Sequence, residues 1–227
     1  MSLLDALLLD PAPFQVWVAD RKDKQRGTGT ASDPLNGGLD RSGVSQFDTV
    51  MNLTQVAQVN VVVHLGPGTF VTKGFADGVA GGWQIKAGMK ILGSGIDVTT
   101  LKVDNANVTV GSHVFAIAHA LQSGTTVDAA EVADLSIDCN CGGANAAAFG
   151  AIRLLGNNAR VRRVKVTKWG TISPTVNAFA IACLTGDVGR DMAGNLIRGA
   201  LTSSGTLLQL WPDPVMVSED AATLSLF

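Results

Sequence analysis

The stretch VADLSIDCN, residues 132–140, and the stretch VRRVKVT, residues 161–167, decide the fold that the sequence predicts. In both, apolar residues alternate with polar ones, and Leu135 corresponds to Val164, 29 positions later (164 minus 135). Alternation with a period of two is typical of strands with one buried face. A repeat of roughly 20 to 50 residues indicates a solenoid.

Other short apolar segments recur around these two stretches. Met89–Leu92 resembles Leu135–Asp138, and an interleaved series comprises Phe115–Ala118, Ala151–Leu154 and Phe179–Ala182. The last two members of that series are 28 positions apart (179 minus 151). Nearly equal offsets in two interleaved series are expected of successive coils, whose strands would stack in parallel about 4.8 Å apart.

The flanking segments differ in texture from this region. We expect a short apolar helix and then a strand at Phe14–Val18, a polar loop over 20–43, and an amphipathic helix of about three turns over 45–58. One face of that helix carries Phe47, Val50 and Met51. The predicted organisation is an N-terminal cap and polar loop (1–43), a β-helix (44–184) and an irregular C-terminal segment (185–227).

Composition excludes several classes of partner. The formal net charge is −2, so no basic excess is available to neutralise phosphates, and nucleic acid is not expected as a partner. No run approaches the roughly 20 apolar residues of a membrane span, and the N-terminal residues lack the basic start of a signal peptide. Three cysteines, Cys139, Cys141 and Cys183, are an odd number and are expected to be structural or free thiols.

Four segments resemble the pectate-lyase-like and polygalacturonase-like family. They are VVVHLGPGTF (61–70), IKAGMKILGSG (85–95, followed by Thr99-Thr100-Leu101), VADLSIDCN (132–140) and Arg160–Thr171. The resemblance spans about residues 44–184. It implies an all-β fold, a short right-handed parallel β-helix with an N-terminal capping helix. It also implies an extracellular or cell-surface domain directed at an acidic polysaccharide. The same fold carries many activities, so function must be argued from the site.

Aligned coils would place a polar ladder on one exposed face. Asp134 would stack with Arg163, Ser136 with Lys165 and Asp138 with Thr167, and Lys90 would lie one coil before Ser136. If the domain is catalytic, the resemblance implies a polysaccharide lyase or a glycoside hydrolase, with Arg163 or Lys165 as the base. It implies substrate contacts at Asp134, Asp138, Lys90 and Trp169. It also implies calcium as a cofactor for such a lyase, although the sequence has no clustered acidic calcium site.

Structural interpretations compete with these catalytic ones. Asp134 and Arg163 could form an ion pair between coils, Asp138 could begin a turn, and Trp83 and Trp169 could pack against loops instead of stacking on a sugar. Asp134 and Asp138 would be roughly 13 Å apart along a strand, which is too far for the usual carboxylate pair of a glycoside hydrolase.

Two other functions remain open from the sequence. One is a non-catalytic structural or adhesive module, like part of a surface protein or phage tail spike. The other is an inactive, truncated copy of a longer enzyme. An uncapped solenoid end exposes apolar surface and unpaired strands. A homo-oligomer that forms through that end is therefore a further expectation.

Overall fold

The computed structural model describes residues 13–76, 82–108, 111–119, 127–142, 146–156, 158–171, 180–184, 215–217 and 223–226. Within these residues the regular secondary structure is almost all strand, with one short helix, which agrees with the expected all-β class. The elements are β1 (Phe14–Ala19), β2 (Leu35–Asn36), α2 (Phe47–Met51), β3 (Val61–Leu65), β4 (Gly68–Thr72), β5 (Lys90–Leu92), β6 (Thr99–Val103), β7 (Gly111–Ile117), β8 (Glu131–Asp138), β9 (Ala146–Leu155), β10 (Arg160–Thr167), β11 (Gly170–Thr171), β12 (Ile181–Leu184), β13 (Val215–Val217) and β14 (Thr223–Leu226).

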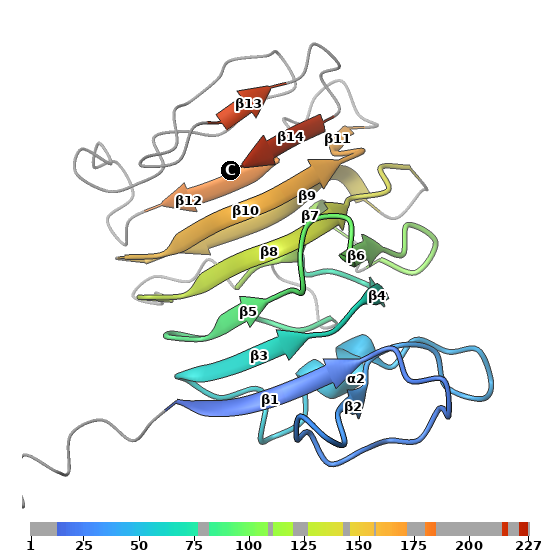
Figure 1. Cartoon of the computed structure of the whole chain (residues 1–227). Coiled ribbons are helices and arrows are strands. Elements are labelled where there is room, and N and C mark those ends of the chain that lie inside the picture. Colours follow the sequence, from blue (N-terminus) through green and yellow to red (C-terminus); the bar gives the residue numbers. More distant parts are fainter. Residues whose placement is uncertain are drawn as a thin grey trace, which may run out of the picture.

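A parallel stack of β1, β3, β5, β8 and β10 forms the spine of the larger sheet (Figure 1). The register aligns one apolar residue from each strand: Val16, Val63, Ile91, Val132 and Val161. The first four are buried and Val161 packs against them. Because side chains alternate along a strand, the neighbours of these residues point outward.

The strand β8 is long enough to pair with two earlier strands. Its first half pairs with β5 and its second half with β6. Between the halves lies Asp134, whose φ of 61° bends the strand. The sheet curls at this bend. Beyond the bend, β4 pairs with β6 in parallel.

The second sheet holds β7, β9 and β12 in parallel, behind the spine in Figure 1. Ile117, Ile152 and Ile181 are aligned across it. The interleaved series of apolar segments is therefore confirmed as a stack. The predicted alignment of Ala151 with Phe179 is wrong by one position, because Ile181 pairs with Ile152 and the offset is 29 (181 minus 152).

The helix α2 closes the lower part of the core. Phe47 is buried against Phe70, with ring centroids 5.6 Å apart, and against Trp83, at 5.8 Å. The predicted helix over 45–58 is wrong in length, because α2 ends at Met51 and turns follow. The residues after it include Thr54 and Val56, whose branched side chains disfavour helix.

Four corners with positive φ precede the stacked strands. Asn60, Gly88, Ala129 and Asn158 have φ of 58°, 66°, 56° and 57°, and they lie one or two residues before β3, β5, β8 and β10. Neighbouring corners are close: a Cβ on Gly88 would lie 1.9 Å from Asn60 Oδ1. The closeness of the corners explains why glycine occupies the second one.

Two C-terminal strands extend the larger sheet by antiparallel pairing. β14 pairs antiparallel with β10, and β13 pairs antiparallel with β14. These strands come from the segment expected to cap or truncate the last coil. The rest of 185–227 and the apolar residues 1–12 lie outside the described residues.

Candidate functional site

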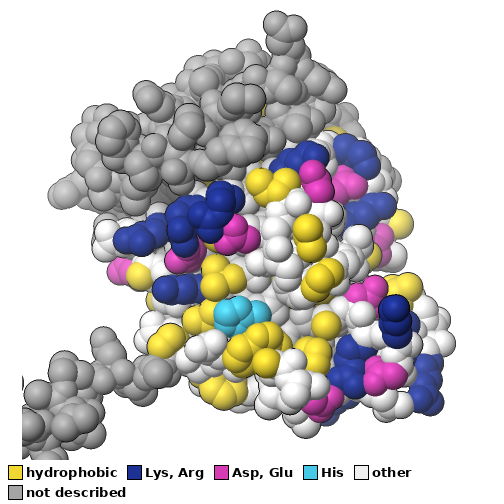
Figure 2. All heavy atoms as spheres, in the orientation of Figure 1, with side chains coloured by type: hydrophobic (Ala, Val, Ile, Leu, Met, Phe, Trp, Pro, Cys, Tyr) yellow, Lys and Arg dark blue, Asp and Glu magenta, His cyan; other side chains and the backbone are white. Residues whose placement is uncertain are grey.

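The solvent side of β1, β3, β5, β8 and β10, here called the outer face, carries most of the predicted site residues. In Figure 2, apolar side chains gather on the lower part of this view, around a histidine ring, and Lys and Arg side chains gather above them beside Asp and Glu. The face therefore has an apolar part and a charged part.

Arg163 and Asp134 form the first ion pair of the charged part. Arg163 donates from Nε to Asp134 Oδ1 at 2.5 Å and from Nη2 to Oδ2 at 2.7 Å. These hydrogen bonds hold the pKa of the Asp134 carboxyl below its usual value. The predicted stacking of the two residues is confirmed, and the carboxylate that Arg163 holds is the protein's own.

Lys165 stacks on Ser136, as predicted, and its ammonium group reaches Asp97. Lys165 Nζ donates to both carboxylate oxygens of Asp97 at 2.9 and 3.0 Å. The backbone N–H of Asp97 donates to Ser136 Oγ at 2.9 Å, which fixes the loop that carries this carboxylate. The Lys165 ammonium group is therefore engaged in an ion pair with Asp97.

Asp138 begins a turn and also pairs with a lysine. Its Oδ1 accepts the backbone N–H of Asn140 at 2.9 Å, and its Oδ2 lies 2.9 Å from Lys168 Nζ. The turn interpretation of Asp138 is confirmed. Its register partner across the coil is Thr167, as predicted.

The predicted position of Lys90 is wrong. Lys90 pairs with Glu131, and Ser136 instead faces Thr100. Two short strands, β5 and β6, pair with β8, and the first of them meets the first half of β8. The buried Glu131 carboxylate accepts from Arg162 Nε at 2.9 Å and lies 3.9 Å from Lys90 Nζ.

Neither of the tryptophans considered as sugar platforms is exposed. Trp169 is 9% exposed and Trp83 is 2% exposed, and both belong to the hydrophobic core. The φ of 51° at Lys168 breaks the alternation of β10, so the next residue turns inward. Trp169 is thus a packing residue and offers no ring face to a ligand.

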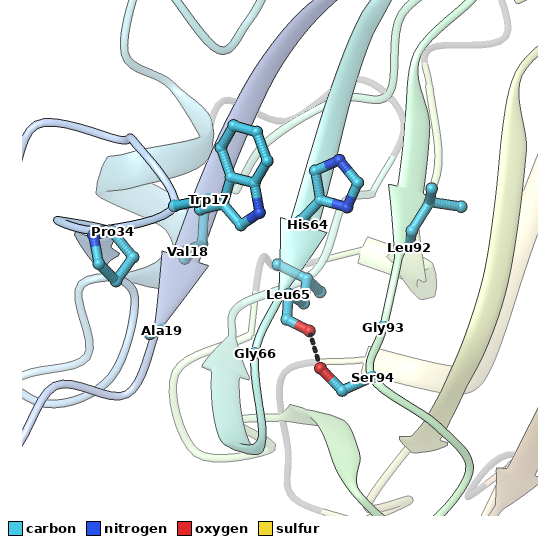
Figure 3. A pocket seen from close by; sticks show the side chains of 11 residues that line it. Trp17, Val18, Ala19, Pro34, His64, Leu65, Gly66, Leu92, Gly93 and Ser94 are labelled. Atoms are coloured by element: carbon cyan, nitrogen blue, oxygen red, sulfur yellow. Dashed lines mark hydrogen bonds between the residues drawn. The ribbon is translucent and has the colours of Figure 1, made fainter.

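A hollow of about 320 Å³ lies in the apolar part of the outer face, around Trp17 and His64 (Figure 3). The two half-buried rings come from β1 and β3 and are stacked, with centroids 4.8 Å apart and planes at 14°. The hollow is completed by Pro34, Leu92 and Ser94, among other residues. Ser94 Oγ donates to the carbonyl of Leu65 at 2.9 Å, which anchors its side of the hollow.

Burial favours the neutral form of the His64 ring. Burial lowers its pKa below the ordinary value of 6.5, and Nε2 lies 3.1 Å from Gln15 Oε1. A neutral ring stacks on Trp17 without a charge in the hollow. The site offers an aromatic surface with hydrogen-bonding groups at its edge, which suits a ligand that has both apolar and polar faces.

The sequence interpretation missed Trp17, although a signal was present. In Gln15-Val16-Trp17-Val18 the two valines are buried, so the alternation places Trp17 on the outer face. An aromatic residue at an outward strand position is the feature that would have identified it.

A second hollow, of about 610 Å³, lies beside α2. It is lined by Asp48, Lys73 and Asp104, among others. Asp48 accepts from Thr72 Oγ1 at 2.6 Å and from the backbone N–H of Lys73 at 2.8 Å. Burial raises the pKa of Asp48. These bonds join the helix to β4, so Asp48 has a structural role.

The described residues do not fit a calcium site. Among them, no three His, Cys, Asp or Glu side chains lie close enough to hold a metal ion. The carboxylates of Asp134 and Asp138 are already bound to Arg163 and Lys168.

The described part of the chain also has no helix of sufficient length and apolarity to cross a membrane.

Comparison of the chain with protein-family models, curated proteins and solved structures found no match in any of the three.

Proposed function

We propose that the protein is a right-handed parallel β-helix domain, extracellular or at a cell surface, that binds an acidic polysaccharide on its outer face. The observation that carries the proposal is the proximity of two features on that face. One is the hollow with the Trp17–His64 stack, and the other is the group of Lys90, Arg160 and Arg162 around Glu131. Sugar rings have apolar faces suited to the first, and acidic groups are suited to the second.

The β-helix part of the proposal is supported by the order of the strands. β8 lies in the larger sheet, β9 in the second sheet, and β10 returns beside β8 in parallel. A parallel crossover of this kind is right-handed in about 98% of cases. The recurring offsets of 28 and 29 residues (91 minus 63, 164 minus 135) agree with successive coils.

Binding without catalysis is favoured over the lyase reaction. A lyase base must contact the substrate, whereas the groups expected as the base are engaged by carboxylates of the protein itself. Arg163 and Lys165 each hold such a carboxylate, at Asp134 and Asp97. Lys90 and Arg162 surround a single buried carboxylate, so positive charge remains there for a ligand.

Calorimetric titration tests the proposal. We expect polygalacturonate or alginate to bind and neutral galactan to bind at least tenfold more weakly, with affinity that falls as salt rises because of charge screening. Lys73→Gln, an exposed lysine beside the second hollow, is the matched control and should leave affinity unchanged. Absence of binding to every acidic polymer by folded protein would contradict the proposal.

An ultraviolet assay for unsaturated uronate products, with and without calcium, tests the lyase reading. We expect no product. A calcium-dependent product that Arg163→Ala abolishes would overturn the non-catalytic reading and restore Arg163 as the base.

A structural or adhesive module is the second candidate function. The ion pairs Arg163–Asp134 and Lys168–Asp138 join one coil to the next, which is a structural use of the predicted site residues. Light scattering tests it: a trimer or filament together with no polysaccharide binding would favour this candidate.

A further inference from the structure

We propose that the polysaccharide lies across the strands, with a sugar ring over Trp17 and an acidic group at Arg162. The inference rests on the proposed function and specifies how the outer face holds its ligand. It assigns the two ends of the binding surface to two residues that are 145 positions apart in the sequence (162 minus 17).

The register of the sheet places both ends on one straight column. Trp17 pairs with His64, His64 with Leu92, Leu92 with Ala133 and Ala133 with Arg162. These five residues, here called the Trp17 column, share the outward side of five successive strands. Four intervals of about 4.8 Å separate its ends, which gives a length of about 19 Å.

The middle of the Trp17 column is uncharged, and its Leu92 borders the hollow. Leu92 and Ala133 carry no charge, and Ala133 is small and covered by its neighbours. The column on one side of it carries charge at Lys90 and Glu131, and Asp134 follows Ala133 directly along β8. A chain of sugar rings that lies along the Trp17 column therefore meets the partly exposed Leu92 and the side chains that cover Ala133, with Lys90 along one edge.

The two ends differ in chemistry. At the first end the half-buried Trp17 ring is held by its stack on His64 and borders the hollow, so the ring is fixed before a ligand arrives. At the other end Arg162 uses Nε and Nη2 on Glu131 Oε1. Guanidinium groups carry five N–H donors, so donors remain for a ligand carboxylate.

Oligogalacturonides of two lengths test the inference by calorimetric titration. A hexasaccharide can span the column, whereas a disaccharide can reach only one end. We expect Trp17→Ala to weaken hexasaccharide binding roughly two- to twelvefold, because the contact of the sugar with the aromatic ring is lost. Loss of the Arg162 guanidinium should weaken it about tenfold or more. Disaccharide binding should depend on no more than one of the two residues.

A paired variant guards against misfolding. Arg162→Gln alone would leave the buried Glu131 carboxylate short of a partner, so Glu131→Gln/Arg162→Gln removes both charges together. Melting curves confirm that each variant is folded, and Lys73→Gln again serves as the control.

The outcomes separate the inference from the proposed function. If the hexasaccharide binds wild type, and binds Trp17→Ala or Glu131→Gln/Arg162→Gln with unchanged affinity, the inference is overturned and the proposed function stands. If disaccharide binding depends on both ends, the inference is also overturned. If no acidic oligomer or polymer binds wild type, the proposed function fails, and the inference fails with it.

Discussion

Asp134 and Arg163 lie at the same bend of the adjacent strands β8 and β10, both with positive φ (61° and 46°), and their side chains are joined by two hydrogen bonds. The flanking residues keep ordinary register, since Ala133 pairs with Arg162 and Leu135 with Val164. Positive φ is uncommon for a residue with a side chain, and more so for arginine than for aspartate. The ion pair therefore offsets part of the cost of this backbone conformation.

The backbone conformation of Arg163 predicts an unusual order of stabilities. Arg163→Val should unfold more easily than Arg163→Gly by roughly 1–2 kcal/mol, because glycine alone adopts positive φ without steric cost. Urea denaturation measures the difference. Lys165 lies two residues later and does not have positive φ, so it provides the control. There the Lys165→Val variant should be more stable to urea than the Lys165→Gly variant. If the same residue, valine or glycine, gave the more stable variant at both positions, the argument would be contradicted.

Acid should destabilise the fold below about pH 4. The pKa values of Asp33, Asp40 and Asp134 are lowered in the folded state by hydrogen bonds, from a usual value of 3.8. Lowered carboxyl pKa values stabilise the fold above 3.8, and this stabilisation is lost as the pH falls through the folded values. Asp48 has a raised pKa and changes in the opposite direction, so it offsets part of the loss.

The share of Asp134 in this pH dependence can be isolated. Arg163→Gln removes the hydrogen bonds that lower its pKa, so the melting temperature of that variant should fall less between pH 5 and pH 2.5 than that of wild type. An identical fall in both proteins would show that the pair has no role in acid stability.

Glu131 should make Arg162 more important for stability than an exposed arginine. We expect Arg162→Gln to cost about 2 kcal/mol, because it removes the guanidinium that is hydrogen-bonded to a buried carboxylate, whereas Lys90 lies 3.9 Å away. Glu131→Gln/Arg162→Gln should recover most of that loss, and a double-mutant cycle measures the coupling. Additive effects of the two single changes would contradict the expected coupling.

Gly93 should not tolerate a side chain. A Cβ there would lie 2.2 Å from the Asp134 carbonyl oxygen and 2.7 Å from Leu135 Cβ. Gly93→Ala should therefore destabilise the protein by about 2 kcal/mol or more, or prevent folding. Gly66→Ala is the control, because its nearest neighbour would be 3.5 Å away and its effect should be small. Equal melting temperatures for the two variants would rule out the close approach.

The part of the fold that could be predicted is the part where one strand repeats without interruption. Leu135 and Val164 were aligned correctly because both strands carry the same pattern, with the bend at Asp134 and Arg163 in the same place. Lys90 was misplaced because Met89–Leu92 shows the same alternation while its coil is divided between β5 and β6. Alternation identifies the buried side of a strand, but it does not say which half of a longer neighbour the strand meets.

The electrostatics of the candidate site could be predicted only in part. Asp134 and Arg163 occupy equivalent places in two repeats, so their contact follows from the alignment. The contact between Lys165 and Asp97 does not, because Asp97 lies in a loop that has no counterpart in the repeat. Trp169 was expected outside and lies inside because the positive φ of Lys168 reverses the alternation, and no residue type there signals it.

The corners with positive φ have a consequence for how the chain could be lengthened. Successive corners at Asn60, Gly88, Ala129 and Asn158 are separated by 28, 41 and 29 positions (88 minus 60, 129 minus 88, 158 minus 129), yet the strands after them stay in parallel register. The stack is therefore set by where each coil begins and not by how many residues the coil contains. A foreign peptide grafted between two corners could be displayed on this scaffold without a change in strand pairing.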